Sequence, residues 1–280
     1  METPRQRTLD GTASLSGIAL HTGHRVRLAV HPGEADAGIV FRRTDLAGSP
    51  SVAASIHNVV DTRRGTTIAQ GEAAVHTVEH LLAAFNALGI DNAVVDMDGP
   101  EPPVGDGSSD PFVKLVRTAG AREQNAERRF AEVKEILYYQ KDDTRLVVVP
   151  DDAFRIACTV KFGGSAMDCQ YLGLEVTEES FVKDLSLGRT FCQYHEIEAL
   201  VKANLIRGGS LDNAVIIKGN AILSREGLRY ADEFVRHKML DIVGDFFLLG
   251  RRLKGQVIAI KPGHPSNVAM ARIISEKLGI

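Results

Sequence analysis

Two segments far apart in the chain carry residues that could together bind a metal ion and use it. Residues 76–80 read His-Thr-Val-Glu-His, and residues 237–241 read His-Lys-Met-Leu-Asp. On a helix, His237 and Asp241 would lie one turn apart on the same face. A catalytic zinc site requires three protein ligands, an open position for water and a nearby base. The two segments offer enough nitrogen and oxygen donors for such a site, so a metal hydrolase is the first hypothesis.

The first segment allows two interpretations. His76, Glu79 and His80 match the H-x-x-E-H pattern of inverted zinc peptidases, in which both histidines bind zinc and the glutamate is the base. With His237 and Asp241 added, four protein ligands would close the site, which suits structural better than catalytic zinc. Ligand counting therefore favours one histidine, and we expect His76 to lie in the first helical turn without a metal role. A peptidase, and a binding scaffold with a structural metal, stay open as alternatives.

Asp245 and His264 could take part in proton transfer. His237, Asp241 and Asp245 fall at positions i, i+4 and i+8, which form one continuous helix face. His264 lies in a Lys-Pro-Gly-His-Pro loop between an expected strand and a helix, and such loops commonly hold catalytic groups. It could act as a cation and general acid held by Asp245. A turn histidine without a role is the competing interpretation.

Composition limits the classes of protein to consider. The chain has 280 residues, more than a typical single domain, so we expect two domains. A net charge of -3 gives no electrostatic footprint for nucleic acid. Three cysteines without CxxC spacing suit a reducing cytosol. We find no signal peptide and no apolar run of the roughly 20 residues that a membrane span needs, and we expect a cytoplasmic protein without a transmembrane segment.

The two parts of the chain show the same order of expected elements. In the first part we expect strands at 13–20, 26–30 and 38–42, a helix at 75–88, a strand at 92–97 and a helix from Pro111. In the second part we expect strands at 135–139, 146–149, 154–162 and 213–217, a helix at 231–249, a strand at 256–260 and a helix from residue 266. The polar segment 119–129 marks the boundary. The sequence thus predicts two similar α+β domains, residues 1–120 and 130–280, facing each other across one metal.

Six short motifs, spread over essentially the whole chain, together resemble one known family. They are S-G-I-A-L-H-T-G at 16–23, T-V-E-H-L at 77–81, D-G-S at 106–108, G-R-T-F at 188–191, E-F-V-R-H-K-M-L-D at 233–241 and G-H at 263–264. The chain resembles the UDP-3-O-acyl-N-acetylglucosamine deacetylases, the zinc amidases that commit Gram-negative bacteria to lipid A synthesis.

The resemblance implies a role for each residue of the site. Zinc, or ferrous iron in the cell, would be held by His80, His237 and Asp241, with Glu79 as general base. The imidazolium of His264, oriented by Asp245, would stabilise the oxyanion or protonate the leaving amine. Thr190 would donate a hydrogen bond to the oxyanion. Lys238 and Phe162 would contact the nucleotide, with Phe162 stacking on uracil, and Phe191 would line the substrate pocket.

The resemblance also implies a fold and a substrate. Each of two α+β domains would be a sheet layered with helices, with the active site between them. A small βαβ-type insertion in the second domain, about 192–222, would form the acyl passage, with Leu200, Val201, Leu205 and Ile206 as suitable lining. The partner would be a UDP-linked 3-O-(3-hydroxyacyl)-N-acetylglucosamine that loses acetate to a monomeric enzyme. The chain departs from the family at Gly65, where a Cys is common, and at Val104-Gly105, where Ile-Met is usual.

Overall fold

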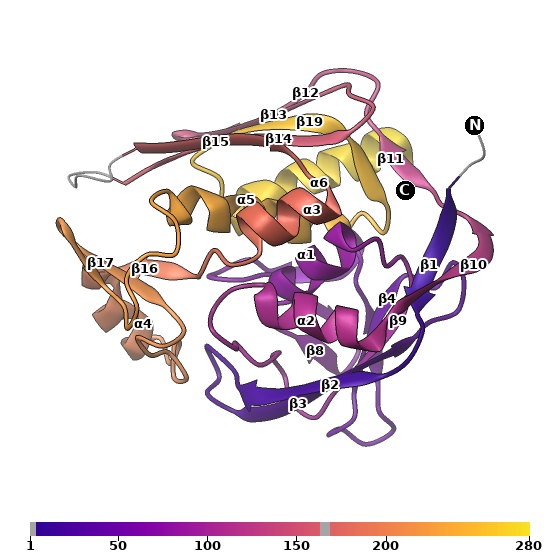
Figure 1. The fold of residues 1–280 in the computed structure, drawn as a ribbon, viewed down its shortest axis with the longest axis horizontal. Helices are drawn as coiled ribbons and strands as arrows, with labels where there is room; N and C mark the ends of the chain where they lie inside the picture. Colours follow the sequence, from indigo (N-terminus) through magenta and orange to yellow (C-terminus); the bar gives the residue numbers. More distant parts are fainter. Residues whose placement is uncertain (1–3, 163–168) are drawn as a thin grey trace.

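The computed structural model describes residues 4–162 and 169–280 of the chain, which form an α+β fold built around two large sheets (Figure 1). The first sheet has the order β2-β3-β9-β4-β5. Its strands are Ala13–Ile18 (β2), Arg25–Pro32 (β3), Ile39–Arg43 (β4), Ser51–Ala53 (β5) and Ala93–Met97 (β9). The second sheet has the order β12-β13-β19-β14-β15, and β11 (Phe130–Glu132) pairs in parallel with β19. Its other strands are Leu137–Lys141 (β12), Thr144–Val149 (β13), Phe154–Lys161 (β14), Cys169–Glu175 (β15) and Arg252–Ile260 (β19).

The two sheets share one topology. In each, four successive strands form two hairpins, and a fifth strand, β9 or β19, enters between the hairpins. This fifth strand is antiparallel to the second strand and parallel to the third in both sheets. The order helix, strand, helix predicted at the end of each half is confirmed, and the structure extends the likeness to the whole of both sheets.

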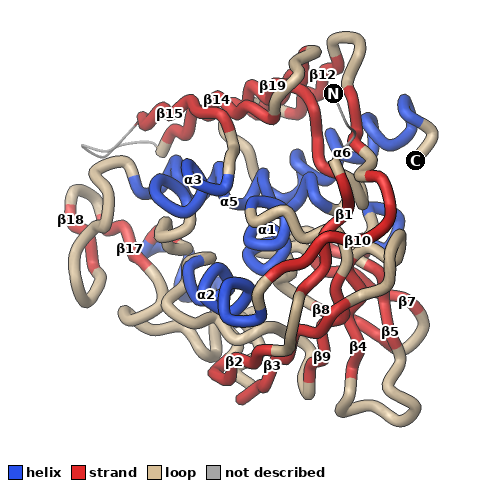
Figure 2. Tube along the Cα trace, turned by 45° about the vertical axis from the view of Figure 1, so that its right-hand side comes forward, coloured by secondary structure: helices blue, strands red, loops and turns tan. Residues whose placement is uncertain are grey.

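The main helices lie between the two sheets (Figures 1 and 2). They are Glu79–Ala87 (α1), Asp110–Ala119 (α2), Glu233–Phe247 (α5) and His264–Leu278 (α6). A short helical segment, which comprises Glu178–Ser180 (α3) and a π-helical turn Phe181–Leu185, lies in the same layer. The strands turn alternate residues toward this layer: Val26, Leu28 and Val30 of β3 are buried, whereas Arg25 and Arg27 are exposed. All nine residues of α1 are buried because the helix has neighbours on every side.

Helices α1 and α5 pack directly against each other at the centre of the molecule. Their backbones approach so closely that a Cβ atom at Gly244 of α5 would lie 2.0 Å from the carbonyl oxygen of Glu79. Only glycine fits this contact, which brings the start of α1 against α5. The side chain of Asn86 adds a hydrogen bond across the pair, donating to the carbonyl of Val243 at 2.9 Å.

Smaller units complete the fold. Arg5–Leu9 (β1) pairs with Ala121–Glu127 (β10), and Val59–Asp61 (β6), Thr67–Gln70 (β7) and Ala73–Val75 (β8) form a three-stranded sheet. The segment 119–129 was predicted as a polar boundary, but most of it is strand β10, because its backbone pairs with β1 while its side chains stay largely exposed. The domain limits 1–120 and 130–280 stay a prediction.

The expected insertion forms a separate βαβ unit (Figure 1). Phe191–Gln193 (β16) pairs in parallel with Val215–Lys218 (β17), and Ile197–Lys202 (α4) lies between them in the chain. Ala221–Leu223 (β18) closes this small sheet as an antiparallel edge. Its strands fall close to the predicted limits of about 192–222.

The predicted start of the first helix is wrong. Residue 75 ends β8, and α1 begins only at Glu79, because Thr77 adopts a left-handed φ of 54°. The hydroxyl of Thr77 donates to the buried carboxylate of Glu101 at 3.0 Å, which stabilises this turn. His76 therefore lies before the helix rather than in its first turn. In the described residues, no helix is both long and apolar enough to cross a membrane.

We expect Gly244→Ala to destabilise the protein, because the added methyl group would force α1 and α5 apart. Overpacking of this kind costs about 1–3 kcal/mol in free energy of unfolding, measurable by chemical denaturation. Gly11→Ala is the control, since a Cβ there meets nothing closer than 3.5 Å. Equal stability of the two variants would show that the α1–α5 contact is not as tight as described.

Candidate active site

The contact between α1 and α5 brings the three predicted metal ligands together. His80 comes from the first turn of α1, and His237 and Asp241 lie one turn apart on α5. The Nε2 atoms of both histidines lie 3.6 Å from Oδ1 of Asp241, and one donor atom from each of the three lies within 4.8 Å of the others. The two imidazole rings meet edge to face, with centroids 5.1 Å apart. All three side chains are buried.

The donor set fits a divalent cation. Asp241 Oδ1 is buried and has no hydrogen-bond partner among the described residues, which is costly unless a further group such as a cation binds it. His237 donates its Nδ1 hydrogen to the carbonyl of Gly188 at 3.2 Å. Its Nε2 atom, which faces Asp241, is therefore unprotonated and can donate its electron pair to a metal ion. Burial lowers the pKa of His237 to about 3, which keeps this imidazole neutral. Burial acts to raise the pKa of Asp241, but the nearby cations Lys238 and His264 hold it well below its usual range.

A second group of titratable side chains lies beside the first. Glu79, Asp245 and His264 also place donor atoms within 4.8 Å of one another. His264, the first residue of α6, donates its Nδ1 hydrogen to Asp245 at 2.9 Å. Its Nε2 atom lies 3.7 Å from Glu79 and 3.9 Å from Asp241. Helix α5 thus supplies both metal-site residues and the partner of His264.

The electrostatics of this group suit proton transfer. Burial raises the pKa of Glu79, which makes it a better proton acceptor than an ordinary glutamate. For His264, burial acts to lower the pKa, but the carboxylates of Asp245, Asp241 and Glu79 outweigh it and raise the pKa to about 9. His264 is therefore cationic near neutral pH. A base and an acid lie side by side, next to the possible metal ligands.

Two residues that hold this arrangement were missed by the sequence analysis. Thr66 is fully buried; its backbone N–H donates to Glu79 Oε2 at 2.9 Å, and its hydroxyl donates to Asp245 Oδ1 at 2.6 Å. Asn267 donates to the other oxygen of Asp245 at 2.9 Å. Neither residue belongs to a motif with chemical meaning, so only their tertiary positions identify them.

The loop before Thr66 packs directly on the base. A Cβ atom at Gly65 would lie 3.2 Å from Glu79 Oε1 and 3.1 Å from the hydroxyl of Thr77. The next residue back, Arg64, has a left-handed φ of 64°, and its carbonyl accepts a hydrogen bond from His21 Nε2 at 3.2 Å. Gly65, one of the positions at which the sequence analysis expects a departure from the family that the chain resembles, thus lies against the reacting groups.

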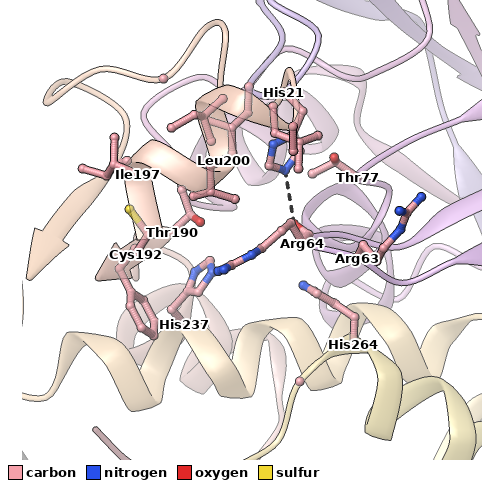
Figure 3. Close-up of a pocket in the computed structure, with 18 of the residues that line it drawn as sticks. His21, Arg63, Arg64, Thr77, Thr190, Cys192, Ile197, Leu200, His237 and His264 are labelled. Carbon is pink, nitrogen blue, oxygen red and sulfur yellow. Dashed lines mark hydrogen bonds between the residues drawn. The ribbon is translucent and has the colours of Figure 1, made fainter. Parts of the chain in front are cut away.

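A single cavity of about 900 Å³ connects these groups with an apolar region (Figure 3). Its polar part is lined by Glu79, His80, His237 and His264, with Thr190, Phe191 and Lys238 nearby. Its apolar part lies in the insertion and includes all four residues expected to line an acyl passage, namely Leu200, Val201, Leu205 and Ile206.

The three residues expected to contact substrate lie in different settings. Lys238 donates to Asp241 Oδ2 at 2.8 Å, and its Nζ atom lies 5.6 Å from the centre of the Phe191 ring. Phe162 packs edge to face against Phe191 and Phe234, with centroids 5.3 and 5.8 Å away. Among the described residues, Lys238 and Phe191 line the cavity, whereas Phe162 does not. The stacking of Phe162 on uracil stays a prediction.

The peptidase alternative finds no support in this geometry. It requires His76 and His80 one turn apart on a helix, but His76 lies outside α1. The Nδ1 atom of His76 instead bonds to the hydroxyl of Thr67 at 3.0 Å. Among the described residues, the two groups of potential metal ligands do not include His76.

Two histidines and a carboxylate around one point, with a buried glutamate beside them, are the groups of a metal-dependent hydrolase. A family model described as UDP-3-O-acyl N-acetylglycosamine deacetylase matches residues 6–276. The chain belongs to this family.

Individual relatives agree with the family match. A protein of Citrifermentans bemidjiense is 45% identical over 262 residues, which cover 94% of this chain and 86% of the relative. A protein of Phenylobacterium zucineum is 45% identical over 276 residues, 97% of this chain and 94% of the relative. A protein of Teredinibacter turnerae is 41% identical over 275 residues, 98% of this chain and 91% of the relative. All three are named UDP-3-O-acyl-N-acetylglucosamine deacetylase.

We expect His80→Ala and His237→Ala to lose metal, because each removes a ligand. Removing groups that merely support ligands costs about 10–100-fold in metal affinity, and the loss of a ligand should cost at least as much. His76→Ala should bind zinc like the unsubstituted protein. Equilibrium dialysis followed by elemental analysis measures all three. Loss of zinc from the His76 variant would revive the H-x-x-E-H interpretation.

Proposed function

We propose that the chain is a zinc-dependent amidase that removes the N-acetyl group from UDP-3-O-(3-hydroxyacyl)-N-acetylglucosamine. It releases acetate in the committed step of lipid A biosynthesis. The observation that carries the proposal is the continuous cavity of about 900 Å³, which joins a metal-ligand set and an acid–base pair to an apolar region. A deacetylase acting on an acylated sugar nucleotide needs all three. The names of the relatives agree with this substrate.

Zinc held by His80, His237 and Asp241 supplies Lewis acidity, and ferrous iron is the alternative metal in the cell. Glu79 takes a proton from the attacking water, aided by the raised pKa that burial gives it. Thr190 lines the cavity and donates a hydrogen bond to the carbonyl oxygen as negative charge develops there. These residues carry the first half of the reaction, in which water adds to the acetyl carbonyl.

His264 carries the second half. It is cationic because three carboxylates surround it, so it can donate its Nε2 proton to the amine nitrogen as the C–N bond breaks. Asp245 accepts the Nδ1 hydrogen and thereby fixes the direction of Nε2. Acetic acid and the free amine form, and the acid gives up its proton as acetate leaves. The proton held by Glu79 then passes to Nε2 of His264, 3.7 Å away, so that both groups regain their starting states.

The rest of the cavity binds the substrate outside the reacting amide. Lys238 contacts the nucleotide from the cavity wall, of which Phe191 forms part. Phe162, which packs on Phe191 and does not line the cavity, contacts the part of the nucleotide that lies beyond it. The acyl chain enters the insertion along Leu200 and its neighbours, which line the apolar part. We place this monomeric enzyme in the cytoplasm, with the acylated sugar nucleotide as its partner.

The test is acetate release from this substrate by the zinc-loaded protein, with Glu79→Gln as the variant. Loss of a general base typically costs about 10²–10⁴-fold in rate, and we expect a loss in kcat of that size with zinc content unchanged. Glutamine has nearly the same shape and keeps an acceptor for the Thr66 N–H, so the site should otherwise remain intact. Near-normal turnover by this variant would rule out Glu79 as the base.

We expect Thr66→Val to lower kcat by about 10–100-fold, as is typical when a group that orients a catalytic residue is lost. Valine keeps the shape and the backbone N–H but removes the hydroxyl that fixes Asp245. Thr66→Ser, which retains the hydroxyl, should restore most of the activity, and KM should change little in either variant. If the serine variant were as slow as the valine variant, packing rather than the hydrogen bond would explain the effect.

A further inference from the structure

An ion pair joins the loop that packs on Glu79, whose Arg64 lines the cavity, to Glu196 of the insertion. The Nη2 atom of Arg64 lies 2.6 Å from Oε1 of Glu196. A further hydrogen bond fixes the position of each partner. His21 binds the carbonyl of Arg64, and the other oxygen of Glu196 accepts the N–H of Gln193 at 3.0 Å. In Figure 3 the Arg64 side chain extends into the space that the labelled residues surround.

The chain neighbours of the pair contact both the reacting groups and the apolar part of the cavity. Arg64 is two residues before Thr66, which holds both Glu79 and Asp245. Glu196 directly precedes α4, and Ile197 of that helix is already one of the residues that line the apolar part. An acyl chain that runs from the reacting sugar into the insertion would therefore lie near Arg64, which lines the same cavity as Ile197.

The chemistry of the pair suits one small functional group. Burial acts to raise the pKa of Glu196, but Arg64 and the Gln193 N–H hold it below its usual value, so the pair is charged. The side chains are 42% and 29% exposed, which leaves polar atoms able to accept a new partner. A guanidinium only donates hydrogen bonds and a carboxylate only accepts them. A hydroxyl group does both, whereas a plain methylene would cover charged atoms and return no hydrogen bond.

We infer that Arg64 and Glu196 bind the hydroxyl group that the acyl chain carries near its ester, and so select hydroxyacyl over unsubstituted acyl substrates. The inference rests on the proposed function, because it assumes that an acyl chain enters the insertion. It assigns a specificity role to a residue that no catalytic motif contains.

The same loop provides a matched control. Arg63 is the neighbouring residue and also forms an ion pair, with Asp61 at 2.8 Å. Its side chain is 86% exposed, and its partner is on its own loop rather than on the insertion. Replacing Arg63 therefore removes the same charge from the same loop without removing the contact with Glu196.

The experiment compares kcat/KM for two UDP-linked substrates of equal acyl length, one with a 3-hydroxyl group and one without it. Hydrogen bonds to charged groups contribute about 1.5–3 kcal/mol, which corresponds to a preference of about 10-fold or more. We expect the unsubstituted protein and Arg63→Met to show this preference. In Arg64→Met the ratio should fall to near one, and Glu196→Gln should lower it as well.

The outcomes separate the two proposals. If the unsubstituted protein hydrolyses both substrates equally well, or if Arg64→Met keeps the preference, the ion pair does not select the hydroxyl group, although the proposed function stands. Should Arg64→Met be too unstable to assay, Glu196→Gln decides the matter from the other side of the pair, and an unchanged ratio there overturns the inference. If neither substrate is hydrolysed by the unsubstituted protein, the proposed function is wrong and the inference falls with it.

Discussion

The site depends on the close contact between helices α1 and α5. Both helices are buried between the two sheets, and Gly244 lets the α5 backbone meet the carbonyl of Glu79. This one contact sets the distance between His80 and the pair His237–Asp241, which lie on different helices. It also holds Glu79 beside them, because Glu79 and His80 are adjacent in the first turn of α1. A site assembled on two buried helices has less freedom to deform than one assembled on loops. The metal ligands therefore keep their relative positions before substrate binds.

Charge balance is the second constraint on this centre. Glu79, Asp241 and Asp245 are all buried, and isolated buried carboxylates are costly unless they are paired and hydrogen-bonded. Asp245 has three donors from protein side chains, while Asp241 is bound by Lys238 on one oxygen only. The other oxygen of Asp241 is the atom toward which both candidate histidine ligands point. The arrangement is therefore one in which a divalent cation would complete the coordination and offset the negative charge.

The loop between β6 and β7 links the reacting groups to the acyl region. Thr66 bonds to the base and to the partner of His264, Gly65 leaves room for Glu79, and Arg64 reaches the insertion. Three successive residues thus contact the catalytic groups, leave space beside the base and reach the region proposed to bind the acyl chain. The loop can serve all three because the small β6-β7-β8 sheet holds both of its ends, while Arg64 lines the cavity and Thr66 is buried beside the reacting groups.

Spacing along the chain was enough to predict the chemical types at the site and the repeated order of elements. A His and an Asp four residues apart, a Glu next to a His, and the order helix, strand, helix can be read locally, because each depends on spacing within one element. Local patterns failed where long-range contacts decide the backbone: the start of α1 is set by Thr77 and its bond to Glu101, and β10 exists because it pairs with β1. Long-range contacts place His76 outside the helix, bond Thr66 to both Glu79 and Asp245, and pair Arg64 with Glu196 of the insertion. These relations join residues up to about two-thirds of the chain apart, and no spacing within a single element encodes them.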